Sequence, residues 1–281
     1  MREGGLDLAV WPHAAYERRL EFEADDFARK KPSVNGKPLD FWLKTDLSNN
    51  VPTILSGMSE VKVGGAIGRQ FRVYNTVAIT DSNRSYMGLI GKYYLTPFNE
   101  FIPLARYFPR VYSWVSDKIV PLSRGPRRFL FLNDGTRLAA YICYEEFIAA
   151  HARKYVHDGA QVLVAVSNDA YFGKSAGPRH HLSGSRLRSI ENRRFLVRGA
   201  SSGISAIVDP TGRIVKEIEV DQSGFAVSDI VPLDELSMFT CGGADIGYKL
   251  GAAIMIIMSM VGAVYYVVLT ALGAPDKLRN R

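Results

Sequence analysis

One cysteine in this sequence stands where a thiol could be reactive. Cys143 ends the apolar run LAAYIC and directly precedes the run YEEFIAAHARKY, which has the composition of a helix. A thiol at a strand-to-helix turn lies near the N-terminus of the helix, where free N–H groups and the helix dipole favour the thiolate and could hold an oxyanion. Most cysteines without a disulfide are structural core residues, so position alone leaves both interpretations open.

A lysine and a glutamate form the second candidate. Lys92 comes straight after an apolar stretch and opens the aromatic-rich segment KYYLTPFNEF, which is an unusual setting for a solvated charge. Glu100, eight residues later, could pair with the lysine or act as a base. Local sequence alone favours two ordinary surface charges.

The segment SNDAYFGKSAGPRHHL (167–182) follows an apolar run and mixes glycine, asparagine, aspartate and aromatic residues. Loops that line sites have this composition, so Asn168, Tyr171 and Phe172 are expected to line a substrate pocket. His180 and His181 are adjacent and point to different sides of a helix, so they cannot chelate one metal as an i, i+4 pair would. We expect neither a metal nor a cofactor.

Composition narrows the class of protein. The chain has 281 residues, 47% of them hydrophobic and 22% charged, which predicts a packed core and excludes wholesale disorder. Its two cysteines make neither a disulfide framework nor a zinc site. The net charge of +7 suits two kinds of anionic partner, nucleic acid and anionic lipid. The basic run 186–198 is interleaved with apolar residues, as in an amphipathic element of a packed domain, and nucleic acid is therefore rejected.

The elements that must position these residues alternate between strands and helices, which predicts an α/β class with a mixed sheet. Helices are predicted over 14–31, 145–156 and 178–192. Strands are predicted over 7–11, 53–58, 72–79, 87–94, 138–143, 162–167, 195–198, 204–208, 213–218 and 225–230. One globular domain is predicted over 1–240.

The last part of the chain predicts a membrane anchor. Residues 250–274 are 25 positions without a charge, and about 20 apolar residues suffice to cross a bilayer. The basic tail 275–281 is then placed in the cytoplasm by the positive-inside rule, and the main domain in the periplasm. No earlier apolar span is present to carry the domain across, so we expect membrane segments upstream of Met1 in the natural protein.

Several motifs occur together in an order that resembles the nitrilase (carbon–nitrogen hydrolase) superfamily. More narrowly, they are similar to the nitrilase domain of apolipoprotein N-acyltransferases and to TraB-type conjugal transfer proteins. The matching stretches are VWPHAA (10–15), RVYNTVAI (72–79), GKYYLTPFNEFIPL (91–104), YICYEEF (141–147), VAVSNDAYFGKSAGPRHHL (164–182) and RSIENRRFLVRGASSGISAIVDPTGRIV (188–215).

The resemblance implies an αββα sandwich with one C-terminal transmembrane helix. It implies a thioester mechanism in which Cys143 takes an acyl chain from a phospholipid and passes it to a lipoprotein amine, at the bacterial inner membrane. Lys92 would stabilise the tetrahedral oxyanion and Glu100 would support the lysine. Tyr144 and Glu145, directly after the nucleophile, would shape the substrate pocket.

The sequence departs from this family in two ways. The family's first catalytic residue is the glutamate of a W-P-E motif, and here Trp11-Pro12 is followed by His13. An imidazole can deprotonate a thiol, but it differs in size from a carboxylate and can become positively charged. The family's domain also starts one strand and one helix earlier, so we expect this part to be missing.

Two alternatives remain besides the acyltransferase. One is an amidase or nitrilase acting on a small substrate, against which the apolar C-terminal segment and the lysine motif count. The other is a catalytically impaired protein of the same fold that acts in plasmid conjugal transfer. His13 favours this second alternative.

Overall fold

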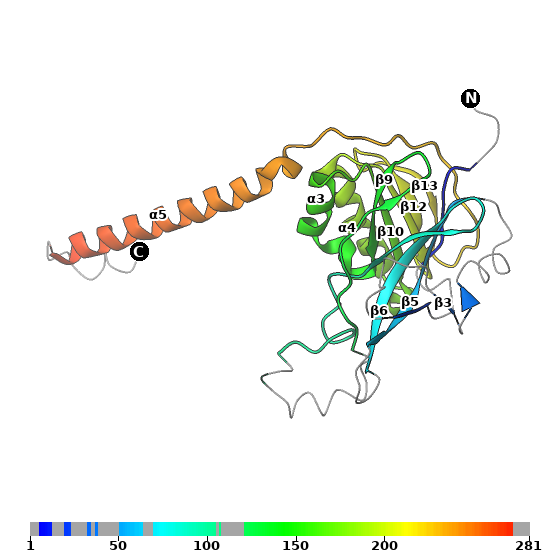
Figure 1. Cartoon of the computed structure of the whole chain (residues 1–281). Coiled ribbons are helices and arrows are strands. Elements are labelled where there is room, and N and C mark those ends of the chain that lie inside the picture. The colour runs from blue at the N-terminus through cyan, green and yellow to red at the C-terminus, as the bar shows by residue number, and fades with distance from the viewer. Residues whose placement is uncertain are drawn as a thin grey trace. The chain divides into compact units, whose positions relative to one another are not determined.

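The computed structural model describes residues 6–12, 20–23, 33–34, 37–38, 51–63, 70–104, 107 and 121–271. The chain divides into two compact units, Met1–Leu236 and Ser237–Arg281, and each is described by itself. In its described part the first unit contains two β-sheets with two α-helices, and the second contains one long helix (Figure 1).

The first sheet has the strand order β4-β3-β2-β5-β6-β7, with β1 paired to β5. Its strands are β1 (Ala9–Val10), β2 (Leu20–Glu23), β3 (Ser33–Val34), β4 (Lys37–Pro38), β5 (Thr53–Val63), β6 (Gln70–Thr80) and β7 (Tyr86–Gly91). The long β5, β6 and β7 form an antiparallel meander in which Asn75 of β6 lies opposite Met58 of β5. This meander carries the chain to Lys92, the residue after β7.

The second sheet has the order β13-β12-β11-β10-β9-β8. Its strands are β8 (Leu130–Phe131), β9 (Arg137–Ile142), β10 (Val162–Asn168), β11 (Leu196–Ser201), β12 (Ser205–Val208) and β13 (Ile214–Ile218). The helical elements of the chain are the 3-10 turns η3 (Cys143–Phe147) and η4 (Ala170–Phe172), the helices α3 (Ala149–His157) and α4 (Gly177–Asn192), and η5 (Phe239–Gly243) followed by α5 (Ala244–Ala271).

Strands β9, β10 and β11 are parallel, and α3 and α4 are the crossovers that join them. Both helices lie along the same face of this sheet (Figure 1). Because parallel strands end at one edge, the residues after β9 and β10 come together there. Cys143 and Asp169 are those residues.

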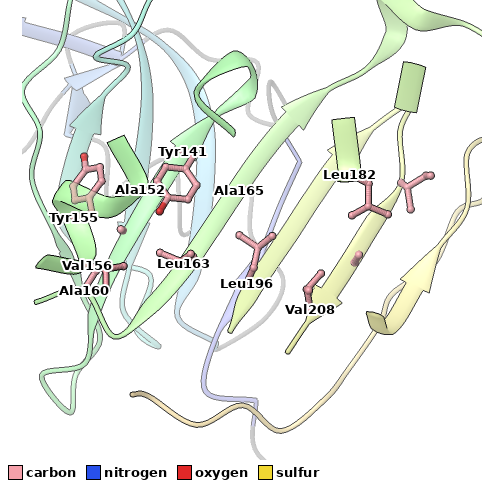
Figure 2. Close-up of a cluster of buried hydrophobic side chains, with 13 residues drawn as sticks. Tyr141, Ala152, Tyr155, Val156, Ala160, Leu163, Ala165, Leu182, Leu196 and Val208 are labelled. Atoms are coloured by element: carbon pink, nitrogen blue, oxygen red, sulfur yellow. The ribbon is translucent and has the colours of Figure 1, made fainter. Parts of the chain in front are cut away.

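The side chains of β9 alternate between two hydrophobic clusters, one on each face of the sheet. Ala139 and Tyr141 pack under α3 and α4 with the cluster drawn in Figure 2. Leu138, Ala140 and Ile142 point the other way, into a second cluster. That cluster also contains residues of β5, β6 and β7, so it joins the two sheets face to face. The described residues thus form a helix layer on two packed sheets, and the α/β class with a mixed sheet predicted from sequence is confirmed.

Two predicted elements are wrong. A helix over 14–31 is contradicted at Leu20–Glu23, which is strand β2 and pairs in parallel with β5. All four residues of this strand pair with Ser59–Lys62 of β5, and this pairing outweighs their helical propensity. The predicted strand 225–230 forms no ladder: Phe225 at its start is 88% exposed, and Ile230 at its end packs against the second cluster without pairing to a strand.

The second unit contains a helix long and apolar enough to cross a membrane. Within α5, residues Lys249–Val268 meet this criterion by length and composition. The predicted span 250–274 overlaps this candidate, and its last three residues lie outside the described part of the chain.

Candidate active site

Lys92 is a buried cation held by a carboxylate. Its side chain is 1% exposed, and Nζ lies 2.7 Å from Oε2 and 2.9 Å from Oε1 of Glu100. Nζ also donates to the hydroxyl of Thr96 at 3.0 Å. The Glu100 oxygens accept further bonds from the Asn75 amide and the Thr96 N–H, at 3.4 and 2.7 Å. The lysine therefore has a fixed position at the end of β7.

Two glycines let the backbone approach Lys92. Gly125 N–H donates to the Lys92 carbonyl at 2.8 Å, and this brings Gly125 against Gly91. A Cβ atom added to Gly125 would lie 2.2 Å from the Gly91 Cα, a separation that real structures do not show. Only glycine fits this crossing, which aligns the lysine loop with the segment 121–129.

Cys143 is half-buried at the point where β9 gives way to η3. Its φ of 52° lies in the left-handed region, which costs a residue other than glycine about 1–3 kcal/mol. Strain of this kind persists only where surrounding contacts enforce it, and it clusters at active sites. The geometry therefore favours a functional interpretation of this cysteine over a simple core role.

Glu145 joins the cysteine turn to the lysine loop. Its Oε1 accepts the backbone N–H groups of Tyr93 and Tyr94 at 2.8 and 3.0 Å, and its Oε2 accepts that of Ile142 at 2.9 Å. The imidazole Nε2 of His151 lies 3.3 Å from Oε1. Because this buried carboxylate is occupied by backbone donors, it is placed to position the two loops rather than to face a substrate.

The electrostatic setting of Cys143 contains opposing effects. Burial raises the pKa of its thiol, while the nearby Lys92 ammonium lowers it. The Glu146 and Asp169 carboxylates raise the pKa again, and a hydrogen bond with the Ser167 hydroxyl lowers it. The Lys92 ammonium thus favours the Cys143 thiolate, whereas burial and the two carboxylates disfavour it.

Behind Cys143 lies a buried charge network that the sequence analysis did not include among the site residues. It consists of Glu146, Asp169, His181 and Arg198, each at most 2% exposed. One signal in the sequence could have revealed it: Arg198 interrupts an otherwise apolar strand, and a charge buried in a strand requires partners. The other three residues look like surface positions in the sequence.

The remaining predicted site residues lie on two turns near the ends of β9 and β10. Tyr144 follows Cys143 in η3, and Asn168 ends β10, where its side chain accepts the N–H of Ala170 at 3.1 Å. Tyr171 and Phe172 in η4 are both exposed, and the Tyr171 hydroxyl accepts a bond from Asn99 of the lysine loop at 3.3 Å. These contacts connect the 167–172 turn with the loop after Lys92.

His13 lies outside the described residues. Among the residues that the structure does describe, no group of three histidine, cysteine, aspartate or glutamate side chains could hold a metal ion.

Fold and site together define a class of protein: an α/β sandwich of two sheets that brings a cysteine, a lysine and a glutamate together at its strand ends. The chain belongs to the carbon–nitrogen hydrolase family, whose sequence profile matches residues 2–234. The solved structure of Saccharomyces cerevisiae Nit3, a member of branch 10 of the nitrilase superfamily, is similar with a TM-score of 0.50 and 17% sequence identity, over 77% of this chain and 74% of that one. This likeness shows the fold alone.

Two curated relatives are apolipoprotein N-acyltransferases, a narrower class than the carbon–nitrogen hydrolases. The apolipoprotein N-acyltransferase of Pseudomonas paraeruginosa (strain PA7) is 33% identical over 173 residues, which are 60% of this chain and 32% of that protein. The apolipoprotein N-acyltransferase of Rickettsia prowazekii is 30% identical over 227 residues, 80% of this chain and 42% of that protein. The predicted resemblance to the nitrilase superfamily and to apolipoprotein N-acyltransferases is confirmed. The chain spans less than half the length of these relatives.

Proposed function

We propose that this chain is part of a membrane-anchored N-acyltransferase that moves an acyl chain from a phospholipid to a lipoprotein amine. The observation that carries the proposal is the strained, half-buried Cys143 beside the fixed Lys92 ammonium, in a chain similar to apolipoprotein N-acyltransferases. A thiol nucleophile and a buried cation suit acyl transfer through a tetrahedral intermediate.

In the proposed reaction the Cys143 thiolate attacks the ester carbonyl carbon of the phospholipid. Lys92 stabilises the oxyanion, and the intermediate collapses to a thioester while the lysophospholipid alkoxide takes up a proton. The acceptor amine then attacks the thioester, forms the amide and releases the thiol. Glu100 holds Lys92 in place through their ion pair, and His13 takes the thiol proton where the family has a glutamate.

Apolar side chains near the site support a lipid donor. Phe98 and Tyr171 are 69% and 72% exposed, and Phe172 is exposed beside them on the turn that contacts the lysine loop. With Tyr144 and Asn168 they would form the rim that receives the acyl chain. Such apolar exposure is costly in water and useful at a lipid surface.

Mass spectrometry of the intact chain after incubation with phospholipid vesicles tests this proposal. An acyl adduct should appear in the wild type, persist in Cys241→Ser, in which the exposed second cysteine is removed, and vanish in Cys143→Ala. A diacylglyceryl peptide with a free amine should then discharge it. An adduct from a small amide but none from phospholipid would point to an amidase instead.

His13 supports a second candidate: a catalytically impaired protein of this fold acting in plasmid conjugal transfer. Absence of an adduct in the wild type together with its appearance in His13→Glu would favour this candidate over the active transferase. Absence in both variants would overturn the acyltransferase proposal.

We also propose that 250–274 spans the bacterial inner membrane, with 275–281 in the cytoplasm and the domain 1–240 in the periplasm. The candidate helix Lys249–Val268 and the basic tail support this arrangement. In a Cys241→Ser background, which removes the exposed second cysteine, a membrane-impermeant maleimide should label Lys216→Cys, exposed on β13, in intact cells. It should label Arg281→Cys only after permeabilisation; labelling of the tail from outside would refute the orientation.

A further inference from the structure

His181 lies in the buried network with acceptors at both ring nitrogens. Nδ1 is 2.7 Å from Oδ1 of Asp169, and this oxygen already accepts the Ser167 hydroxyl at 2.7 Å. Nε2 is 3.3 Å from the carbonyl oxygen of Cys143 and 3.7 Å from Oε1 of Glu146. A neutral imidazole would leave one ring nitrogen without a proton and facing an oxygen lone pair. The surroundings therefore require N–H groups on both sides of the ring.

The charges of the network lead to the same conclusion. Glu146 and Asp169 carry two negative charges, and Arg198 supplies one positive charge through Nε to Glu146 at 2.9 Å and through Nη2 to Asp169 at 3.1 Å. One buried negative charge would remain uncompensated, and burying such a charge is expensive. Oε1 of Glu146 has no hydrogen-bond partner among the described residues, and Nε2 of His181 lies 3.7 Å from it.

The pKa shifts are consistent with this geometry. Burial alone would lower the pKa of His181, but the Glu146 and Asp169 carboxylates outweigh it and raise the pKa despite Arg198. Burial would raise the pKa of Asp169, yet the hydrogen bond from His181 and the charge of Arg198 lower it to about 2. The ring also stacks on Phe147, with centroids 4.9 Å apart.

We propose that His181 is a positioning residue for the nucleophile, a buried imidazolium whose N–H groups fix the backbone at Cys143 and whose charge favours the thiolate. Its Nε2–H holds the carbonyl of the residue that has the strained φ. Its charge offsets the two carboxylates that disfavour the thiolate. The inference rests on the proposed function in taking Cys143 as the nucleophile.

Ser167 connects the imidazolium with the sulfur. Its hydroxyl donates to Asp169 at 2.7 Å, and the same hydroxyl lowers the pKa of the Cys143 thiol. Asp169 keeps donors from His181 and Arg198 when the serine turns away. The hydroxyl hydrogen can then point to the sulfur when the thiolate forms, at little cost to the carboxylate.

The test is the pH dependence of iodoacetamide alkylation of Cys143, followed by mass spectrometry on the whole chain in detergent with Cys241→Ser. His181→Asn can keep a donor toward Asp169 but has no charge and no Nε2–H. Its alkylation midpoint should rise by about one pH unit, so that the reaction at neutral pH slows about tenfold. The matched control is His180→Asn, at the exposed neighbouring residue, which should keep the wild-type midpoint.

An unchanged midpoint in a folded His181→Asn variant would overturn the inference. If that variant does not fold, nitrogen NMR of the wild type decides: both His181 nitrogens should be protonated at neutral pH, and a neutral tautomer would contradict the proposal. Alkylation needs neither phospholipid nor acceptor. A shifted midpoint without any acyl adduct would therefore refute the proposed acyl transfer and leave the role of His181 standing.

Discussion

Replacing Glu100 by glutamine separates a buried ammonium from its counter-charge while almost preserving the shape of the side chain. Each carboxylate oxygen accepts from Lys92 Nζ and from one other donor: Asn75 for Oε1 and the Thr96 N–H for Oε2. In either orientation the new amide NH₂ would face two donors. Breaking a buried ion pair costs about 3–5 kcal/mol. We expect the unfolding free energy to fall by about 3 kcal/mol, the lower end of this range, because the glutamine keeps one carbonyl oxygen that can still accept from Lys92.

Urea unfolding of the whole chain in detergent, followed by circular dichroism, measures this loss. The matched control is Asp158→Asn, which breaks the exposed Lys154–Asp158 pair at the same 2.7 Å separation. Exposed pairs contribute little, so this control should lose less than about 0.5 kcal/mol. The double variant Lys92→Met with Glu100→Leu should be more stable than Glu100→Gln, because no unpaired charge remains buried. Equal losses for Glu100→Gln and Asp158→Asn would refute the reasoning.

Three further predictions follow from the site. His13→Glu should raise acyl-enzyme formation at least about tenfold in the mass-spectrometric assay, because a carboxylate is a base at neutral pH. Full acylation of the wild type and its loss in this variant would instead show that histidine is the working base. Gly125→Ala should lower the unfolding free energy by about 3 kcal/mol, because the added Cβ would meet the backbone of Gly91. The control Gly224→Ala has no atom within 4 Å of the added Cβ and should change the unfolding free energy by less than about 0.5 kcal/mol, so similar losses in the two variants would contradict this packing. The pKa of Asp169 is lowered to about 2 in the folded protein and is near 4 in the unfolded chain, so its ionisation stabilises the fold above about pH 4, and this stability is lost as the pH falls toward 2. In Asp169→Asn the unfolding free energy should therefore fall less steeply over this pH range, and parallel curves of unfolding free energy against pH for the two proteins would argue against it.

The sequence by itself determined the family and most elements between 130 and 218. The parallel strands β9 and β10 are continuous apolar runs because both of their faces are buried, and α4 follows from composition over its 16 residues. The prediction that Cys143 lies at a strand-to-helix turn likewise rests on the residues next to it in the chain. These features depend on neighbours in the chain, which is why residue types were enough to predict them.

Only the tertiary structure decided which polar residues are buried together. Glu146, Asp169, His181 and Arg198 come from η3, the turn after β10, α4 and β11, and none has a sequence neighbour that identifies its partner. Likewise, the acidic residues of β2 suit a helix locally, and pairing with β5 made them a strand. Burial and pairing arise from contacts far apart in sequence, and such contacts determine both the charge of His181 and the setting of the Cys143 thiol.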